Sequence, residues 1–156
     1  MMAWLEGTAL ATWTRQSPSL WAYPTILTLH TVGLGIVVGA SAVIDFRLLG
    51  LAPRMPIPSL SPLFRIIWSA FLLNLATGCL LFMSDATTKS KQPVFYIKLT
   101  LIGLALWNMS VVKGAVLSDP EQGGSAMVPP RYKRLAVLSL LLWAGAITAG
   151  RLMAYL

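Results

Sequence analysis

The chain contains few of the side chains that most enzymes and metal proteins use. Its 156 residues include one cysteine, one histidine and five acidic residues. Cys79 has no second cysteine to pair with, which excludes an intramolecular disulfide and a thiolate metal cluster. Histidine, cysteine and carboxylate residues show no metal-ligand spacing, and no nucleophile, base and orienting group occur together, so hydrolytic chemistry is disfavoured.

Charge is also scarce, and long apolar runs take its place. Only 11% of the residues are charged, 56% are hydrophobic and the mean hydropathy is +0.73, whereas about a quarter of the residues in a soluble domain are charged. A transmembrane helix needs about 20 apolar residues. Because four such runs occur, at 20–44, 60–83, 94–112 and 135–153, we predict an integral membrane protein whose residues 1–156 form one transmembrane domain.

The connections between these runs predict how the helices are arranged. Residues 50–58 are rich in proline, residues 84–92 are short and polar, and residues 113–134 form the longest connection, with proline and glycine typical of an irregular loop. Short connections make successive helices antiparallel, and in lipid each span must satisfy its own backbone. We therefore expect an all-α membrane protein with four transmembrane helices in an antiparallel bundle.

The segment before the first run is mixed in polarity. Residues 1–18 lack the basic start, apolar core and cleavage site of a signal peptide. Trp4 and Trp13 lie in it, and Trp21 and Tyr23 follow at the start of the first run, as in a segment that lies at the level of the lipid headgroups. We expect a short N-terminal interfacial helix.

The formal net charge is +7, but the basic residues lie in short loops and form no soluble face that could bind nucleic acid. Cytoplasmic loops carry an excess of Lys and Arg. Seven such residues on one side against five on the other favour cytoplasmic first and third connections and place both termini outside. The seven are Arg47, Arg54, Arg65, Lys113, Arg131, Lys133 and Arg134, and the five are Arg15, Lys89, Lys91, Lys98 and Arg151.

Two runs contain small residues spaced four apart. Gly35 and Gly39 form one such pair, and Gly145 and Ala149 form another. This spacing lets a second helix approach closely, inside a bundle or between two protomers. The pairs are therefore candidate contacts for a homo-oligomer as well as for packing within the chain.

His30 is the most informative residue, because ionisable side chains are costly in the bilayer core and each one is a functional hypothesis. It lies nine residues after Trp21, about 14 Å along a helix, and Lys98 lies five residues after Pro93, about 8 Å along its helix from the same membrane surface. Asn74 reaches a depth of about 15 Å. We expect these three side chains to share one half of the membrane.

A neutral imidazole in a helical bundle is a good axial ligand for haem iron. His30 would supply one axial position, and Met83, Met109, Lys98 or the histidine of a second protomer would supply the other, unless it stays open. Lys98 would alternatively pair with a haem propionate. The candidate cofactor-binding residues are therefore His30, Lys98, Asn74 and Met109, with His30 as the metal ligand and haem b as the cofactor.

The same side chains also suit purely structural roles. His30 would be a neutral side chain that a backbone carbonyl or Asn74 satisfies, Lys98 would extend to the membrane surface, and Asn74 would form an interhelical hydrogen bond. Asp45 and Arg47, together with Arg65, would form an ion-pair and headgroup anchor.

The segment from Leu29 and His30 to Gly50, with Asp45-Phe46-Arg47, and the segment Phe95-Tyr96-Ile97-Lys98 with Asn108 resemble a family of bacterial four-span membrane proteins. They distantly resemble the HemJ-type protoporphyrinogen oxidases and the CopD-type membrane domains, which also place a histidine in an early span and a lysine early in a later one. The resemblance covers the first and third spans. It implies a haem-linked role for His30, a role in activity for Lys98, and a bacterial inner membrane.

These observations lead to three hypotheses. The first is a b-type haem protein that transfers electrons or oxidises a hydrophobic substrate, with a quinone or another redox partner. The second is a non-catalytic subunit or scaffold that forms a homo-oligomer or part of a larger complex. The third is a carrier for a small solute or a metal.

Overall fold

A computed structural model of the chain describes residues 2–16, 21–118 and 128–155. These residues form helices and connecting turns, with no strand among them. The elements in chain order are α1 (Met2–Glu6), α2 (Ala9–Gln16), α3 (Ala22–Leu49), the 3-10 helix η1 (Ile57–Leu60), α4 (Ser61–Ser84), α5 (Ala86–Lys89), α6 (Pro93–Ser118) and α7 (Pro130–Leu152).

Four of the described helical segments are long and apolar enough to cross a membrane, as the sequence predicts. They are Ala22–Leu49, Ile57–Ser84, Pro93–Gly114 and Pro130–Leu152. Each segment overlaps one of the four runs predicted from hydropathy. Leu20, the predicted start of the first run, lies outside the described residues. The all-helical, four-span character of the chain is thus compatible with a multi-pass membrane protein.

The first long helix continues past the end of its predicted apolar run at Ile44. Asp45 and Arg47 are charged but buried, so α3 extends to Leu49. Gly50 then ends it with a φ of 93°, and its N–H donates to the Arg47 carbonyl at 3.1 Å. This left-handed glycine is the usual helix-ending device that hydropathy alone does not register.

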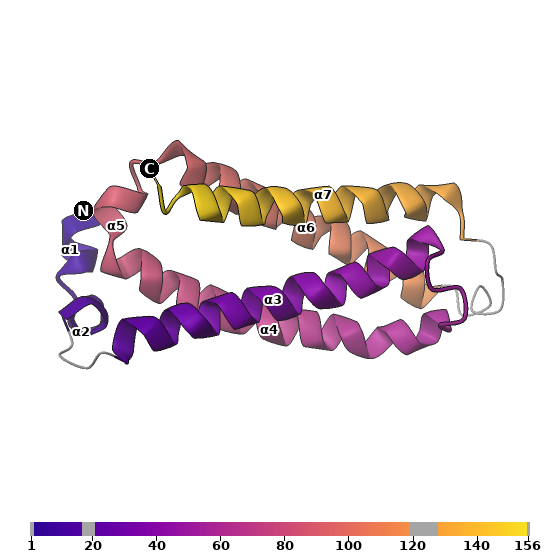
Figure 1. Cartoon of the computed structure of the whole chain (residues 1–156), viewed down its shortest axis with the longest axis horizontal. Helices are drawn as coiled ribbons and strands as arrows, with labels where there is room; N and C mark the ends of the chain where they lie inside the picture. Colours follow the sequence, from indigo (N-terminus) through magenta and orange to yellow (C-terminus); the bar gives the residue numbers. More distant parts are fainter. Residues whose placement is uncertain (1, 17–20, 119–127, 156) are drawn as a thin grey trace.

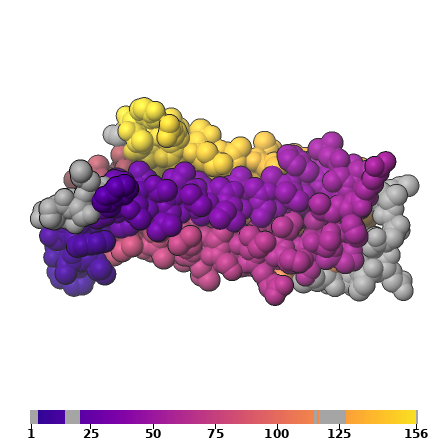
Figure 2. All heavy atoms as spheres, turned by 60° about the horizontal axis from the view of Figure 1, so that its bottom comes forward, coloured from indigo at the N-terminus to yellow at the C-terminus, as the bar shows by residue number. Residues whose placement is uncertain are grey.

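The long helices pack in two pairs. Figure 1 shows α3 along α4 and α6 along α7, and α3 also contacts α7. Short helices α1, α2 and α5 lie together at the end of the molecule that also holds the chain's two ends (Figure 1). Figure 2 shows α3 and α4 side by side along one face.

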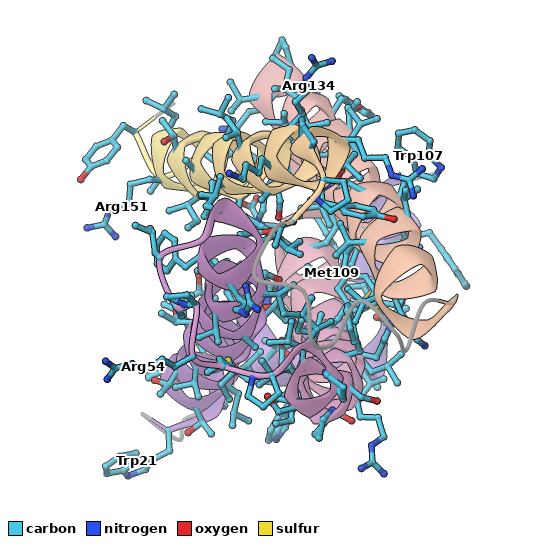
Figure 3. The ribbon with its side chains drawn as sticks, turned by 90° about the vertical axis from the view of Figure 1, so that its right-hand side faces the viewer. Trp21, Arg54, Trp107, Met109, Arg134 and Arg151 are labelled. Atoms are coloured by element: carbon cyan, nitrogen blue, oxygen red, sulfur yellow. The ribbon has the colours of Figure 1, made fainter. Side chains whose placement is uncertain are left out.

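The apolar core occupies the other end, where α3 ends and α4 begins. It contains fully buried side chains from all four long helices, among them Ile44, Leu48, Phe64, Ile67, Met109, Val112 and Ala136. Figure 3, a view along the bundle, shows Met109 in the interior and Trp107 pointing outward. The ribbons of the two pairs diverge from this core toward the end with α1 and α5 (Figure 1).

Candidate functional site

His30 lies in the first third of α3, with its ring against α4. The side chain is half-buried. Its Nδ1 atom lies 3.1 Å from the backbone oxygen of Asn74 and 3.1 Å from Oγ1 of Thr77. Two residues one turn apart on α4 therefore hold the same ring nitrogen.

These contacts determine the tautomer of the neutral imidazole. The Asn74 carbonyl can only accept, and the Thr77 hydroxyl is within donating distance of the Leu73 carbonyl at 2.8 Å and of the Asn74 carbonyl at 3.1 Å. The proton of the ring therefore belongs on Nδ1, which donates to these oxygens, and Nε2 keeps its lone pair. Nε2 makes no hydrogen bond to any part of the chain that the structure describes.

Gly78 provides room for the ring on the same face of α4. A Cβ atom at this position would lie 3.1 Å from Cε1 of His30 and 3.6 Å from Nδ1. A contact of 3.1 Å is tighter than ordinary van der Waals packing. The absence of a side chain at Gly78 is therefore part of what seats His30 against α4.

A cavity of about 470 Å³ adjoins His30 at the end of the bundle where the helix pairs diverge. This volume lies within the range of about 300–1,000 Å³ that is typical of small-molecule and cofactor sites. Residues from all four long helices line it: Tyr23, Leu27, His30, Gly78, Leu81, Phe82, Ser84, Asp85, Lys89, Phe95, Lys98, Gly150, Met153 and Ala154.

Two lysines make one side of this cavity basic. Lys98 is half-buried on α6 and lies along α7 at Gly150, where a Cβ atom would be 3.5 Å from Cε and 3.6 Å from Nζ of the lysine. The charge of Lys98 is close enough to act on His30, and that of Lys89 is close enough to act on Lys98. Lys89 Nζ also donates to the Met153 carbonyl at 3.4 Å. Asp85 is the acidic side chain among the lining residues.

Aromatic rings form another wall. Phe82 near the end of α4 and Phe95 at the start of α6 are stacked, with centroids 5.0 Å apart and planes 13° apart. Both line the cavity, as does Tyr23. An imidazole, two ammonium groups and flat apolar surfaces suit a planar ligand that carries both a metal and carboxylates.

The structure brings some of the predicted site residues together and separates others. His30 and Lys98 line the same cavity, whereas Asn74 contributes its backbone carbonyl and does not line it. Met109 is 1% exposed in the apolar core, eleven residues beyond Lys98 or about 16 Å along α6. Neither Met109 nor Met83 lines the cavity, but Met153 does.

Sequence reasoning missed the other residues of the site. Thr77 had a readable signal, because it lies three residues after Asn74 on one face of α4. Three others lie near helix ends, in the same half of the membrane as Lys98: Phe82, Phe95 and Lys89. Their spacing in the sequence does not show that they line one cavity. Trp107 and Trp143 do not line the cavity, since Trp107 is 65% exposed and Trp143 lies in the core.

The two small-residue pairs face different surroundings. A Cβ atom at Gly145 would lie 3.3 Å from Leu101, and Ala149 is buried, so other parts of the chain cover this pair. A Cβ atom at Gly35 or Gly39 would meet nothing within 4 Å. Of the two pairs, the one on α3 is open to a second chain.

Comparison of the chain with protein-family models, with curated proteins and with solved structures gives no match.

Proposed function

We propose that this chain is a b-type haem-binding protein of a bacterial inner membrane, with a redox or electron-transfer role, in which Nε2 of His30 is an axial ligand. The fixed tautomer supports this proposal most directly. Metal-ligating histidines almost always donate their other ring N–H to a carbonyl, carboxylate or water. Asn74 and Thr77 provide that second contact at Nδ1.

The lining residues fit the proposed group. The cavity has the volume of a cofactor site, and Lys98 and Lys89 are placed to pair with carboxylates such as the two propionates of haem. The stacked Phe82 and Phe95 would offer a bound macrocycle an apolar surface on that side of the cavity. Bound haem supplies one-electron redox chemistry.

The second axial position has no histidine within the same chain. Lys98 lines the cavity and provides one candidate, whereas Met109 lies in the apolar core. A second copy of the chain, or a bound substrate such as a quinol, provides the others. A redox partner would approach the end of the bundle where Tyr23 and Ala154 are exposed.

The proposed setting is an antiparallel bundle with both termini in the periplasm. Helices α1 and α2 would then lie at the periplasmic surface of the inner membrane, beside the mouth of the cavity. The Thr87 backbone N–H donates to Glu6 at 2.6 Å and links α1 to α5 at this end. The excess of Lys and Arg on the opposite side supports this orientation.

An absorption spectrum tests the proposal. The full chain is expressed with an ample haem supply and purified in mild detergent, and we expect a Soret band and a reduced-minus-oxidised difference spectrum. His30→Ala is expected to lose the band, and added imidazole is expected to restore part of it. Thr31→Ala is a matched control, because Thr31 is exposed and donates to its own helix at Leu27. A colourless wild-type protein, or a His30→Ala variant with an unchanged spectrum, contradicts the proposal.

The cavity also favours a second candidate, a carrier for a small anionic solute, since two partly buried lysines line it. A bare metal ion is a poorer cargo, because no group of three or more His, Cys, Asp or Glu that could hold one occurs in the described part of the chain. A carrier would show changed uptake in Lys98→Ala and no haem spectrum in the wild type.

A further inference from the structure

A second polar cluster lies deep in the bundle, away from His30. Ser41 and Asp45 are one turn apart on α3, and Ser139 lies on α7, which packs against α3. All three side chains are 0% exposed. Ser139 is near enough to Asp45 to act on its carboxyl, although the two side chains form no hydrogen bond of ordinary geometry. Ser41 is eleven residues beyond His30, about 16 Å along α3.

The oxygens of this cluster have no hydrogen-bond partner. Ser41 Oγ, Ser139 Oγ and both carboxyl oxygens of Asp45 are buried and unpaired among the described residues. Five other hydroxyls on the long helices behave differently, because each of these five donates to the carbonyl four residues earlier. These are Thr31, Thr77, Thr100, Ser110 and Thr148. The hydroxyls of Ser41 and Ser139 are therefore turned away from their own backbone.

Arg47 does not neutralise this carboxyl. Its Nε donates to the Met55 carbonyl at 2.6 Å, and the expected ion pair with Asp45 is absent from the described residues, since both Asp45 oxygens are unpaired. Arg47 is held by the loop after α3 because Gly50 turns the chain back toward it. An ionised carboxylate buried without a partner costs several kcal/mol or more. A bound cation would remove that cost.

We infer that Ser41, Asp45 and Ser139 form a binding site for a small monovalent cation of the sodium class. Carboxylate and hydroxyl oxygens are the donors that hard cations take in proteins. One carboxylate balances one positive charge, so the donor set suits a monovalent ion better than a divalent one. Transporters also bind Na⁺ between membrane helices through oxygen donors, although there the donors include carbonyls of unwound backbone. The inference does not depend on haem binding at His30.

Thermal unfolding of the full chain in detergent tests the site. We expect the Tm to rise with the logarithm of the NaCl concentration, by about 5 °C at a concentration about tenfold above Kd, relative to choline chloride at equal ionic strength. Asp45→Asn and Ser139→Ala are expected to lose this rise. Ser110→Ala should keep it, because Ser110 is an exposed serine that bonds to its own helix.

Equal Tm values in NaCl and choline chloride, or a Na⁺-dependent rise that survives in Asp45→Asn, would overturn the inference. The first result would mean that the Asp45 carboxyl is held protonated without a cation. If Asp45→Asn does not fold, ²³Na NMR of the wild type and Ser41→Ala decides the question. Broadening of the sodium signal that is lost in Ser41→Ala supports the site, and no broadening in the wild type refutes it.

Discussion

Replacement of Gly78 by alanine tests how the imidazole is held. The new Cβ would lie 3.1 Å from Cε1 of His30, whereas ordinary contacts begin at 3.4 Å, so the ring must move off α4 by at least 0.3 Å (3.4 minus 3.1). The Nδ1 contacts with Asn74 and Thr77, now both 3.1 Å, would lengthen to about 3.4 Å, where hydrogen bonds of this kind weaken. One such bond contributes about 1 kcal/mol.

We therefore expect Gly78→Ala to weaken haem binding about five- to tenfold, since 1.4 kcal/mol corresponds to a factor of ten. The measurement is a titration of the apoprotein in detergent with haem, followed at the Soret band. Gly103→Ala is the matched control, because a Cβ atom there meets nothing within 4 Å. Equal haem affinity in the two variants would refute the reasoning, as it would show that the ring position does not determine ligation.

Four further substitutions separate the site from the core. Thr77→Val removes one acceptor of Nδ1 and should weaken haem binding about fivefold in the same titration, with Thr77→Ser close to wild type. Lys98→Met should lower haem affinity at low salt and make it less salt-dependent, which titrations at two ionic strengths measure. Met109→Ala should destabilise the bundle by about 2–3 kcal/mol in denaturant unfolding and leave the Soret maximum unchanged, since Met109 lies in the core. Asn108→Ala removes the bond from Nδ2 to the Leu135 carbonyl and should cost about 1 kcal/mol in the same unfolding assay.

The four long helices could be predicted because hydropathy is summed over many residues and the bilayer thickness sets the length of each run. Helix ends were less predictable. Asp45 and Arg47 interrupt the first apolar run, yet α3 continues to Leu49 because both side chains are buried and Gly50 provides the left-handed end. A hydropathy pattern places the end of a span at the first charged residue. The helix itself ends where a capping residue, here Gly50, interrupts the helical hydrogen bonds.

The candidate site could be predicted only in part. His30 and Lys98 were chosen because an ionisable side chain is energetically costly in the bilayer and because the two lie in the same half of the membrane. Both line the cavity. Depth gives the position along a helix but not the side that a residue faces, so Met109 was included although it packs in the core. Phe82 and Phe95 were missed because their stacking depends on how α4 and α6 approach one another.

The sequence by itself determined that this chain is apolar and helical, with one imidazole and one lysine placed where ionisable groups are costly. These properties are local, because they depend on composition and on distance along each helix. Tertiary structure decided which ring nitrogen of His30 keeps its lone pair, that Gly78 gives His30 its room, and that Arg47 bonds to the Met55 carbonyl instead of pairing with Asp45. Each of these depends on the rotation of one helix against another, which side-chain packing across the bundle determines.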